Sequence, residues 1–392
     1  MKLINSLMFF LLLPVISYSQ NGDDVVIAKK IIINSTVLGE ERTIIVSTPS
    51  GYSASASSFP VLYVLDGWTG VIGLVNDLSG WGLCPEMIIV VIESTNGIRD
   101  FTPTKPKYDK EGKEIKYQSW DKLGEADKFL SFVETELFTF IDKNYRTLPY
   151  RICSGHSAGG LCVTHAFMSH NKMFNSYIAI SPSLYWDSGL LIRTADEKIG
   201  SMNLKYKQYY FSIGGNEIPS NIGDAHAFNQ TLKIKASGEL RWKFDYLENE
   251  DHGSQATIAL IRGMRFIYEG WKYDSDLLIA GGLNAINSFY HNLSERYGYK
   301  IIPDVSTLNS IGWGVLRAGR HEEAINIFKR NVADHPDSPD AFNYLGEGYF
   351  ADGQTDLSIK SYEKAIELAT TRNDGGLERL KMRLENIKTN KK

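Results

Sequence analysis

This chain of 392 residues has few cysteines, no net positive charge and few long apolar runs. The only cysteines are Cys84, Cys153 and Cys162, and an odd number cannot pair completely within one chain. Cys153 and Cys162 fall in apolar-rich segments, which favours buried free thiols over a disulfide framework. Lysine and arginine number 42 against 46 acidic residues, a formal net charge of −4, so no nucleic-acid partner is indicated.

The apolar run near the N-terminus, Leu7–Ile16, is too short to cross a bilayer, which takes about 20 residues. Lys2 precedes this run, and Ser17 and Ser19 follow it as small residues, which is typical of a secretory signal peptide. We expect residues 1–19 to be that signal, with no lipoprotein anchor, because no cysteine follows the run. The protein is then exported, to the periplasm or the exterior; a buried N-terminal strand or helix is the alternative.

From Val25 to about Trp271, apolar strand-like runs alternate with helical stretches. This alternation predicts an α/β fold with a mostly parallel central sheet, and we assign it to residues 20–275. In the first two runs apolar and polar residues alternate, whereas the later runs are almost continuously apolar. This difference favours an antiparallel edge beside a buried parallel core. The expected strands are Val25–Ile33, Thr43–Thr48, Phe59–Leu65, Met87–Ile92, Arg151–Ser154, Tyr177–Ile180, Tyr209–Ile213 and Arg241–Tyr246. The polar stretch Thr102–Trp120 is either a loop over the active site or a solvated connection.

A second pattern begins near Leu308 and predicts a small all-α domain. Gly312, Gly319, Ala324, Phe328 and Pro336 are followed 34 positions later by Gly346, Gly353, Ser358, Tyr362 and Thr370, in register at the first four positions. A period of about 34 residues is that of the tetratricopeptide repeat, a pair of packed helices. We expect a helical connector over 276–305 and a repeat domain over 306–392, with two repeats and a capping helix over Gly376–Ile387. So short an array should pack against the first domain or a protein partner.

The run Gly155-His156-Ser157-Ala158-Gly159 carries the main functional signal, since it follows an expected strand and precedes a helix-like stretch, Gly160–Met168. In such a strand–turn–helix a serine hydroxyl is held exposed at the end of the sheet, and glycine is favoured two positions away on either side for lack of space. The helix also directs its N-terminal N–H groups toward developing negative charge. We therefore predict Ser157 as a nucleophile.

A serine nucleophile needs a base and an acid that orients it, here in the chain order serine, acid, histidine. His252 follows the last expected strand and precedes a long helix, which is where the base belongs; His156, inside the turn, is expected to point away. The acid should follow Tyr209–Ile213, which favours Glu217 over Asp224, although either carboxylate could serve. Asp251 is expected to be a solvated loop charge.

The oxyanion of an acyl-transfer intermediate needs two N–H donors. One is predicted to be the backbone N–H of Ala158, directly after the nucleophile. The other should come from the loop after Phe59–Leu65, where we assign Trp68 with Gly67 as the alternative. The Trp68 ring could also form a wall of the acyl pocket or simply fill the core.

With these residues placed, the chain resembles an esterase family of α/β-hydrolases that includes siderophore, feruloyl and acetylxylan esterases and S-formylglutathione hydrolase. The matching stretches are Phe59–Gly67, Arg99–Pro103, the turn around Ser157, Ser181–Asp187 and Asp251–Ser254, within residues 25–271. The resemblance implies a serine esterase without cofactor or metal and supports Ser157 and His252. Its members vary at the acid, and some are thought to work with a serine–histidine pair. It also suggests Tyr185 and Trp186 as substrate-binding residues that line the pocket, with packing beneath the sheet end as the alternative.

The substrate is expected to be a small-molecule or glycan-linked ester. An anionic siderophore would be bound by cations such as Arg99, Lys105, Lys107 and Lys110, whereas a sugar ester would favour the aromatic rings of Trp68, Trp120, Tyr185 and Trp186. Two other functions stay open: an inactive hydrolase scaffold that presents the repeats to a partner, and an acyltransferase that uses the same serine.

Overall fold

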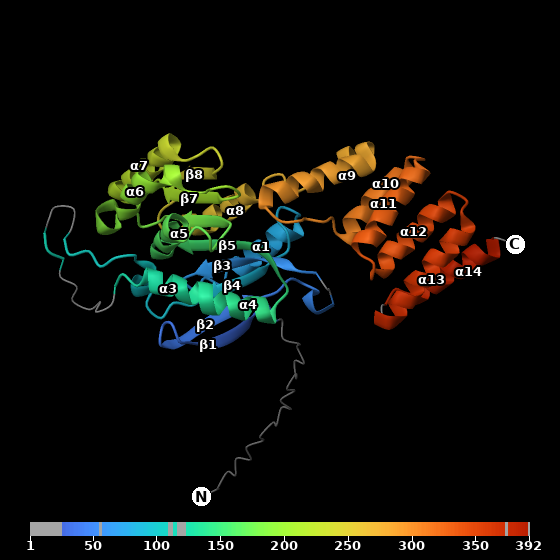
Figure 1. Cartoon of the computed structure of the whole chain (residues 1–392), viewed down its shortest axis with the longest axis horizontal. Coiled ribbons are helices and arrows are strands. Elements are labelled where there is room, and N and C mark those ends of the chain that lie inside the picture. Colours follow the sequence, from blue (N-terminus) through green and yellow to red (C-terminus); the bar gives the residue numbers. More distant parts are fainter. Residues whose placement is uncertain (1–25, 55–56, 109–112, 116–122, 373–374, 391–392) are drawn as a thin grey trace, which may run out of the picture.

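In the computed structural model of this protein, residues 26–54, 57–108, 113–115, 123–372 and 375–390 are described (Figure 1). The expected signal peptide over residues 1–19, Lys110 and Trp120 lie outside these ranges. Among the described residues, no helix combines the length and the apolar character that crossing a membrane requires.

A sheet of eight strands, in the order β1-β2-β4-β3-β5-β6-β7-β8, forms the centre of the first part of the chain. β2 runs antiparallel to both β1 and β4, whereas the six strands β3 to β8 all run parallel to one another. The predicted antiparallel edge on a parallel core is therefore confirmed. The strands are β1 (Lys29–Ser35), β2 (Glu40–Ser47), β3 (Phe59–Leu65), β4 (Ile88–Ile92), β5 (Thr147–His156), β6 (Ser176–Ile180), β7 (Gln208–Gly214) and β8 (Arg241–Leu247).

Most strand boundaries differ from the prediction by a few residues, and pairing explains the differences at β1, β2 and β5. β1 begins at Lys29, not Val25, because its pairing with β2 starts there, and β2 begins at Glu40, earlier than Thr43, because Glu40 pairs with Ser35 at the turn between the two strands. β5 extends well beyond Arg151–Ser154, since Thr147 pairs with Phe59 at one end and His156 pairs with Ile180 at the other. The residues at these strand ends are polar, so a prediction based on apolar runs places the ends of the strands incorrectly.

Helices cover both faces of the sheet. Alternate residues of β3 separate the faces, because Val61 and Tyr63 belong to one apolar cluster and Leu62 and Val64 to the other. The helices of this part are α1 (Val71–Gly80), α2 (Gly97–Phe101), α3 (Ala126–Phe132), α4 (Phe138–Asn144), α5 (Ala158–Ser169), α6 (Trp186–Lys198), α7 (Pro219–Lys235) and α8 (Gln255–Ile267), with a π-helical turn, Val133–Leu137, between α3 and α4. Residues of α3, α5, α6 and α7 pack in the first cluster, and those of α1 and α8 in the second.

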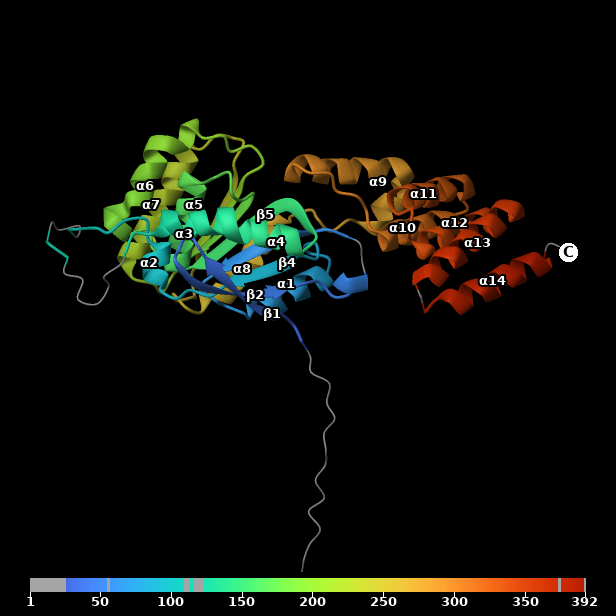
Figure 2. The ribbon, with the colours of Figure 1, turned by 60° about the horizontal axis from the view of Figure 1, so that its bottom comes forward.

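The chain ends in a helical region that extends to one side of the sheet (Figures 1 and 2). It consists of α9 (Ser275–Tyr297), α10 (Val305–Arg317), α11 (His321–Asp334), α12 (Pro339–Ala351), α13 (Thr355–Arg372) and α14 (Leu377–Asn390). From α10 onward each helix contacts the next. Gly312 lies against the Phe328 ring and Gly346 against the Tyr362 ring, so the same glycine–aromatic contact occurs in both helix pairs.

Candidate active site

The turn between β5 and α5 holds Ser157 in a backbone conformation that side chains rarely adopt, with φ 57° and ψ −117°. The chain can turn this sharply because Gly155 has no side chain: a Cβ there would lie 2.6 Å from the Gly159 backbone. The expected space constraint is wrong for Gly159, where a Cβ would meet Leu65 at an ordinary 3.6 Å. The tight position on the helix is Gly160, whose Cβ would lie 2.8 Å from the Ile180 carbonyl oxygen.

The loops after β7 and β8 bring Glu217 and His252 to Ser157. His252 Nε2 lies 3.0 Å from Ser157 Oγ, and His252 Nδ1 lies 3.0 Å from Glu217 Oε2. A carboxylate on Nδ1 keeps the proton there, which leaves the Nε2 lone pair to accept from the serine hydroxyl. The side chain of Glu217 is only 2% exposed while that of His252 is 46% exposed, so the acid is buried behind an accessible base.

Glu217 is held ionised by several donors. The Ser181 hydroxyl and the Gln255 side-chain amide donate to its Oε1, each at 2.5 Å, and the Gly214 N–H donates at 3.3 Å. Burial alone would raise the pKa of Glu217, but the bonds from His252, Ser181 and Gly214 outweigh it and lower that pKa to about 2. In return, the bond to Glu217 raises the pKa of His252 above its usual 6.5. The sequence prediction misses Ser181 and Gln255, although Ser181 opens one of the stretches that carries the family resemblance.

His156 does not point away from the site as expected. Its Nε2 donates to the backbone carbonyl oxygen of His252 at 2.7 Å, and the two rings lie 4.6 Å apart between centroids. Burial lowers the pKa of His156, which keeps its ring neutral beside the base. His156 therefore fixes the backbone that carries His252. This contact joins the end of β5 to the loop after β8, and the order of residues in the sequence does not predict it.

The other two carboxylates considered lie elsewhere. Asp224 is on α7, beyond the loop that carries Glu217. Asp251 accepts from the N–H groups of Gly253 and Ser254, at 2.9 and 2.7 Å, and so forms the turn that presents His252. Glu217 is thus the carboxylate that this geometry brings to the histidine.

The two expected oxyanion donors lie at the ends of β3 and β5. Ala158 is the first residue of α5, and the first amides of a helix have no acceptor within the helix. The alternative Gly67 N–H donates to the Ile92 carbonyl oxygen at 3.1 Å, so it is occupied by the sheet. Trp68 follows two residues with positive φ, Asp66 and Gly67, which turn the chain sharply at the end of β3. Its half-buried ring packs against the core.

A family model described as "Putative esterase" matches residues 35–250, more than half of the 392 residues. The chain belongs to this esterase family. Ferri-bacillibactin esterase BesA of Bacillus subtilis (strain 168) is 27% identical over 257 residues, which cover 58% of this chain and 85% of that protein. The siderophore triacetylfusarinine C esterase of Aspergillus fumigatus is 25% identical over 177 residues, 38% of this chain and 60% of that protein.

Solved structures share the fold of this esterase. An IroE-like serine hydrolase from Shewanella oneidensis has a TM-score of 0.68 at 28% identity, covering 76% of this chain and 98% of that chain. An uncharacterised protein from Capnocytophaga ochracea has a TM-score of 0.62 at 13% identity, covering 92% of this chain and 99% of that chain. At 13% identity this second similarity shows the fold alone. Because it covers 92% of this chain, the match includes helices that follow the sheet.

Arg99 of this esterase is engaged inside the protein, against the expectation that it binds substrate. Its guanidinium donates to Glu40 through Nη1 and Nη2, at 3.0 and 2.6 Å, and to Asp100 through Nε at 2.7 Å. The bond to Glu40 raises the pKa of Arg99 further. Asp100 also pairs at 2.6 Å with Arg42, which is fully buried. Two cations and two carboxylates thus neutralise one another beneath β2, and that neutralisation explains the Arg99–Asp100 stretch better than an anionic ligand does.

The aromatic pair at the start of α6 splits between two roles. Tyr185 is exposed, whereas Trp186 is half-buried and donates from its indole N–H to the Thr104 carbonyl oxygen at 3.1 Å. Thr104 also donates to Asp187 at 2.7 Å, so α6 anchors the described start of the Thr102–Trp120 stretch. Lys105 and Lys107 on that stretch are exposed.

All three thiols are buried, as expected for Cys153 and Cys162. Burial raises the pKa of each thiol, that of Cys84 to about 12. A protonated, buried thiol is a poor nucleophile, so the geometry leaves no competitor to Ser157 among the cysteines.

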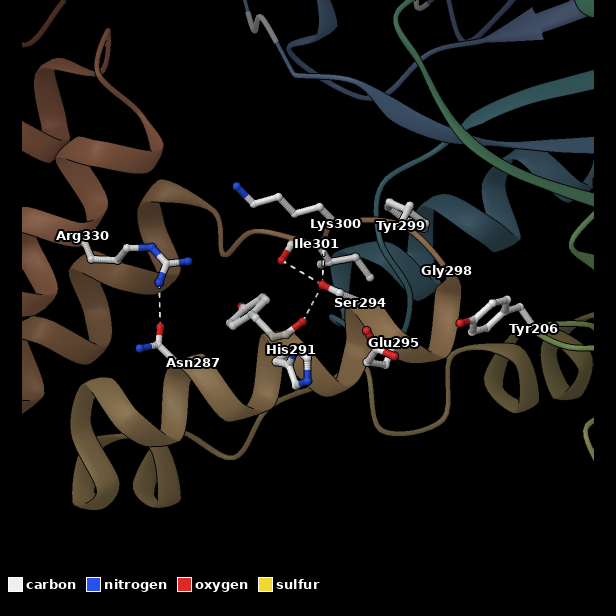
Figure 3. Close-up of a pocket in the computed structure, with 11 residues that line it drawn as sticks. Tyr206, Asn287, His291, Ser294, Glu295, Gly298, Tyr299, Lys300, Ile301 and Arg330 are labelled. Atoms are coloured by element: carbon white, nitrogen blue, oxygen red, sulfur yellow. Dashed lines mark hydrogen bonds between the residues drawn. The ribbon is translucent and has the colours of Figure 1, made fainter.

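A groove of about 530 Å³ runs along α9 and contains none of Ser157, His252 and Glu217 (Figure 3). Arg330 of α11 donates to Asn287 of α9 across it at 2.6 Å. Ser294 accepts from the Ile301 N–H at 2.9 Å and so holds the segment that leads to α10. The groove belongs to the junction between the sheet and the helical region.

Proposed function

We propose that this esterase hydrolyses carboxylic esters through a covalent acyl-enzyme on Ser157. The hydrogen-bonded series Ser157 Oγ, His252 Nε2, His252 Nδ1 and Glu217 Oε2, with both links at 3.0 Å, is the observation that carries the proposal. His252 takes the hydroxyl proton as Ser157 attacks the carbonyl carbon, and Glu217 stabilises the imidazolium that forms. The backbone N–H groups of Ala158 and Trp68 bind the oxyanion.

His252 gives this proton to the departing alcohol, and the loss of the alcohol completes the acyl-enzyme. In the second half of the reaction His252 removes a proton from water as the water oxygen attacks the acyl carbon, and it then returns that proton to Ser157 Oγ as the acid leaves. Each loop supplies one part: the turn after β5 the nucleophile, the loop after β7 the acid, and the loop after β8 the base. Ligand sites in such folds lie beyond the carboxyl ends of the parallel strands, which is where these loops meet.

For the substrate we propose a siderophore ester. A bacterial relative is named ferri-bacillibactin esterase, and a fungal relative is named siderophore triacetylfusarinine C esterase. Exposed Lys105 and Lys107 on the stretch anchored by α6 offer positive charge for an anionic ligand, and Tyr185 offers an exposed ring. A sugar or feruloyl ester is the alternative, and it would rest on Tyr185 and Trp186.

For the remaining segments we propose the organisation expected from the sequence. Residues 1–19 direct export, 20–275 form the esterase domain, 276–305 connect, and 306–392 hold two tetratricopeptide repeats with α14 as a cap. The glycine–aromatic contacts Gly312–Phe328 and Gly346–Tyr362, one repeat length apart, support this organisation. The repeats would give the esterase a surface for a protein partner.

Release of p-nitrophenol from p-nitrophenyl acetate by the purified protein tests the mechanism. We expect Ser157→Ala to lose activity by about 10⁴-fold or more, because removing the nucleophile of such a triad costs up to about 10⁶. The matched control is Ser201→Ala, since Ser201 is exposed and donates to the nearby Lys198 carbonyl oxygen. Turnover that survives Ser157→Ala would show that the nucleophile is wrong.

A panel of ferric and iron-free siderophore esters, with feruloyl and acetylated sugar esters beside them, then tests the substrate. A kcat/KM at least about tenfold higher for a siderophore ester, a difference of about 1.4 kcal/mol in transition-state binding, supports the proposal. The reverse order favours the sugar ester. Wild-type protein without turnover on any ester would favour the binding scaffold. Ester products formed with an added alcohol would identify an acyltransferase.

A further inference from the structure

A second cluster of titratable side chains lies toward the end of α5 that is far from Ser157. It consists of His165 on α5, His170 directly after this helix, and Asp127 in the first turn of α3. His165 Nε2 and His170 Nε2 lie 2.7 and 2.9 Å from the same oxygen, Asp127 Oδ1. One candidate ligand atom from each residue falls within 4.8 Å of the other two.

We propose that Asp127, His165 and His170 form a binding site for one divalent transition-metal ion, with zinc as the first candidate. Two imidazole nitrogens and one carboxylate oxygen are a donor set that zinc uses, at about 2.0–2.2 Å from the ion. In a tetrahedral site these atoms stand about 3.4 Å apart, so Asp127 would have to withdraw by about 0.5–0.7 Å from the rings. The two ring nitrogens, which now lie within 4.8 Å of each other, would have to reach the same separation. A water molecule would complete the coordination.

The rings are able to present lone pairs to an ion. The side chain of His165 is 9% exposed, and its Nδ1 is buried without a hydrogen-bond partner in the described part of the chain. The proton can move to Nδ1 and free Nε2 for an ion, and the free energy of metal binding then has to offset the cost of a buried N–H without an acceptor.

Charge and access at this end of α5 also favour a cation. The last carbonyl groups of a helix carry a partial negative charge, and Asp127 adds a full one. The side chains of Asp127 and His170 are 67% and 30% exposed, so an ion can enter from solvent.

The ion would have a structural role. His165 and His170 follow Ser157 along α5 and its C-terminal end, so at about 1.5 Å per residue the site lies about 12–20 Å along the helix from Ser157. It would fix the start of α3 to the end of α5, two helices that both pack on the same face of the sheet. Ester hydrolysis at Ser157 does not pass through it, so the two proposals can fail separately.

Zinc titration of the full chain, stripped with a chelator and desalted, tests the site by calorimetry against a competing chelator. We expect one ion per chain, and affinity at least about 100-fold weaker in His170→Gln and in Asp127→Asn, since even groups behind metal ligands are worth about 10–100-fold. His321→Gln is the matched control, because His321 is also partly exposed and lies 3.6 Å from an aspartate, Asp352.

A cobalt titration gives a readout that does not depend on stability. Cobalt bound by two imidazoles should show visible d–d absorption in the wild type and in His321→Gln and lose it in His170→Gln. Equal zinc affinity in wild type and His170→Gln, or no zinc binding by the wild type, would overturn the proposal.

Discussion

At the scale of single residues, Glu217 controls where the proton of His252 resides. The buried carboxylate is ionised over the working range of an esterase, because its pKa is lowered to about 2. Its bond to His252 Nδ1 favours the imidazolium and so raises the pKa of His252. The proposed mechanism needs the neutral imidazole, so ester turnover should fall as the pH drops through that raised pKa.

Glu217→Gln tests this coupling. Without the negative charge the pKa of His252 falls, so the acidic limb of the kcat/KM profile should move to lower pH, while kcat at neutral pH drops by about 10²–10⁴-fold because the tautomer is no longer fixed. The profile with p-nitrophenyl acetate measures both effects. Asp224→Asn is the control, and a limb that moves in this variant but stays in place in Glu217→Gln would make Asp224 the acid.

How much of the site can be predicted from sequence depends on how local each contact is. Ser157, His252 and Glu217 follow from one turn motif and from chain order, because each sits directly after a strand of the sheet. The contacts made by Ser181, Gln255 and His156 form only when segments that are far apart in the sequence meet in the fold. No spacing of residues in the sequence predicts these contacts. The contact of Arg99 with Glu40 could not be predicted either, because an arginine in a sequence motif looks the same whether it binds substrate or a carboxylate of its own chain.

At the scale of elements, two helix pairs of the C-terminal region depend on a missing side chain. A Cβ at Gly346 of α12 would lie 2.7 Å from the Tyr362 ring of α13. That ring is fully buried, and its hydroxyl donates to Glu347 at 2.6 Å, so it has little room to withdraw. The two glycine–aromatic contacts can be predicted from the sequence because the same residue types recur at a fixed period, whereas the ends of β5 depend on pairing with β3 and β6, which are distant in the sequence.

Gly346→Ala should therefore destabilise the helical region by about 1–3 kcal/mol, the usual cost of overpacking. Gly223→Ala is the matched control, since Gly223 lies on α7 and a Cβ added there would have nothing within 4 Å. In that control, alanine should stabilise the protein by about 0.5–1 kcal/mol through helix propensity. Urea denaturation followed by circular dichroism compares the two variants. A gain in stability in both would mean that α12 and α13 are not packed as closely as described.

At the scale of the whole molecule, one apolar cluster extends from the sheet into the helical region. It includes Leu62 of β3, Leu260 of α8, Tyr297 of α9 and Ile311 of α10. Tyr297 stands at the junction: its ring centroid lies 5.3 Å from that of Tyr150 on β5 and 5.4 Å from that of Tyr268. Its hydroxyl donates to the Ile267 carbonyl oxygen at 2.9 Å. The sequence predicts that a short repeat array needs support, but it does not identify these aromatic rings as the support.

Because the cluster is shared, we expect the esterase part and the helical region to unfold together. Tyr297→Ala should lower the free energy of unfolding by about 3–5 kcal/mol, as for other large aromatics removed from a core. Tyr297→Phe keeps the ring and loses one hydrogen bond, so it should cost only about 1 kcal/mol. Urea denaturation followed in parallel by ester turnover and by circular dichroism measures both variants. If Tyr297→Ala left the midpoint of turnover unchanged while the helical signal shifted, the two regions would be stabilised independently, and the shared core would not couple them.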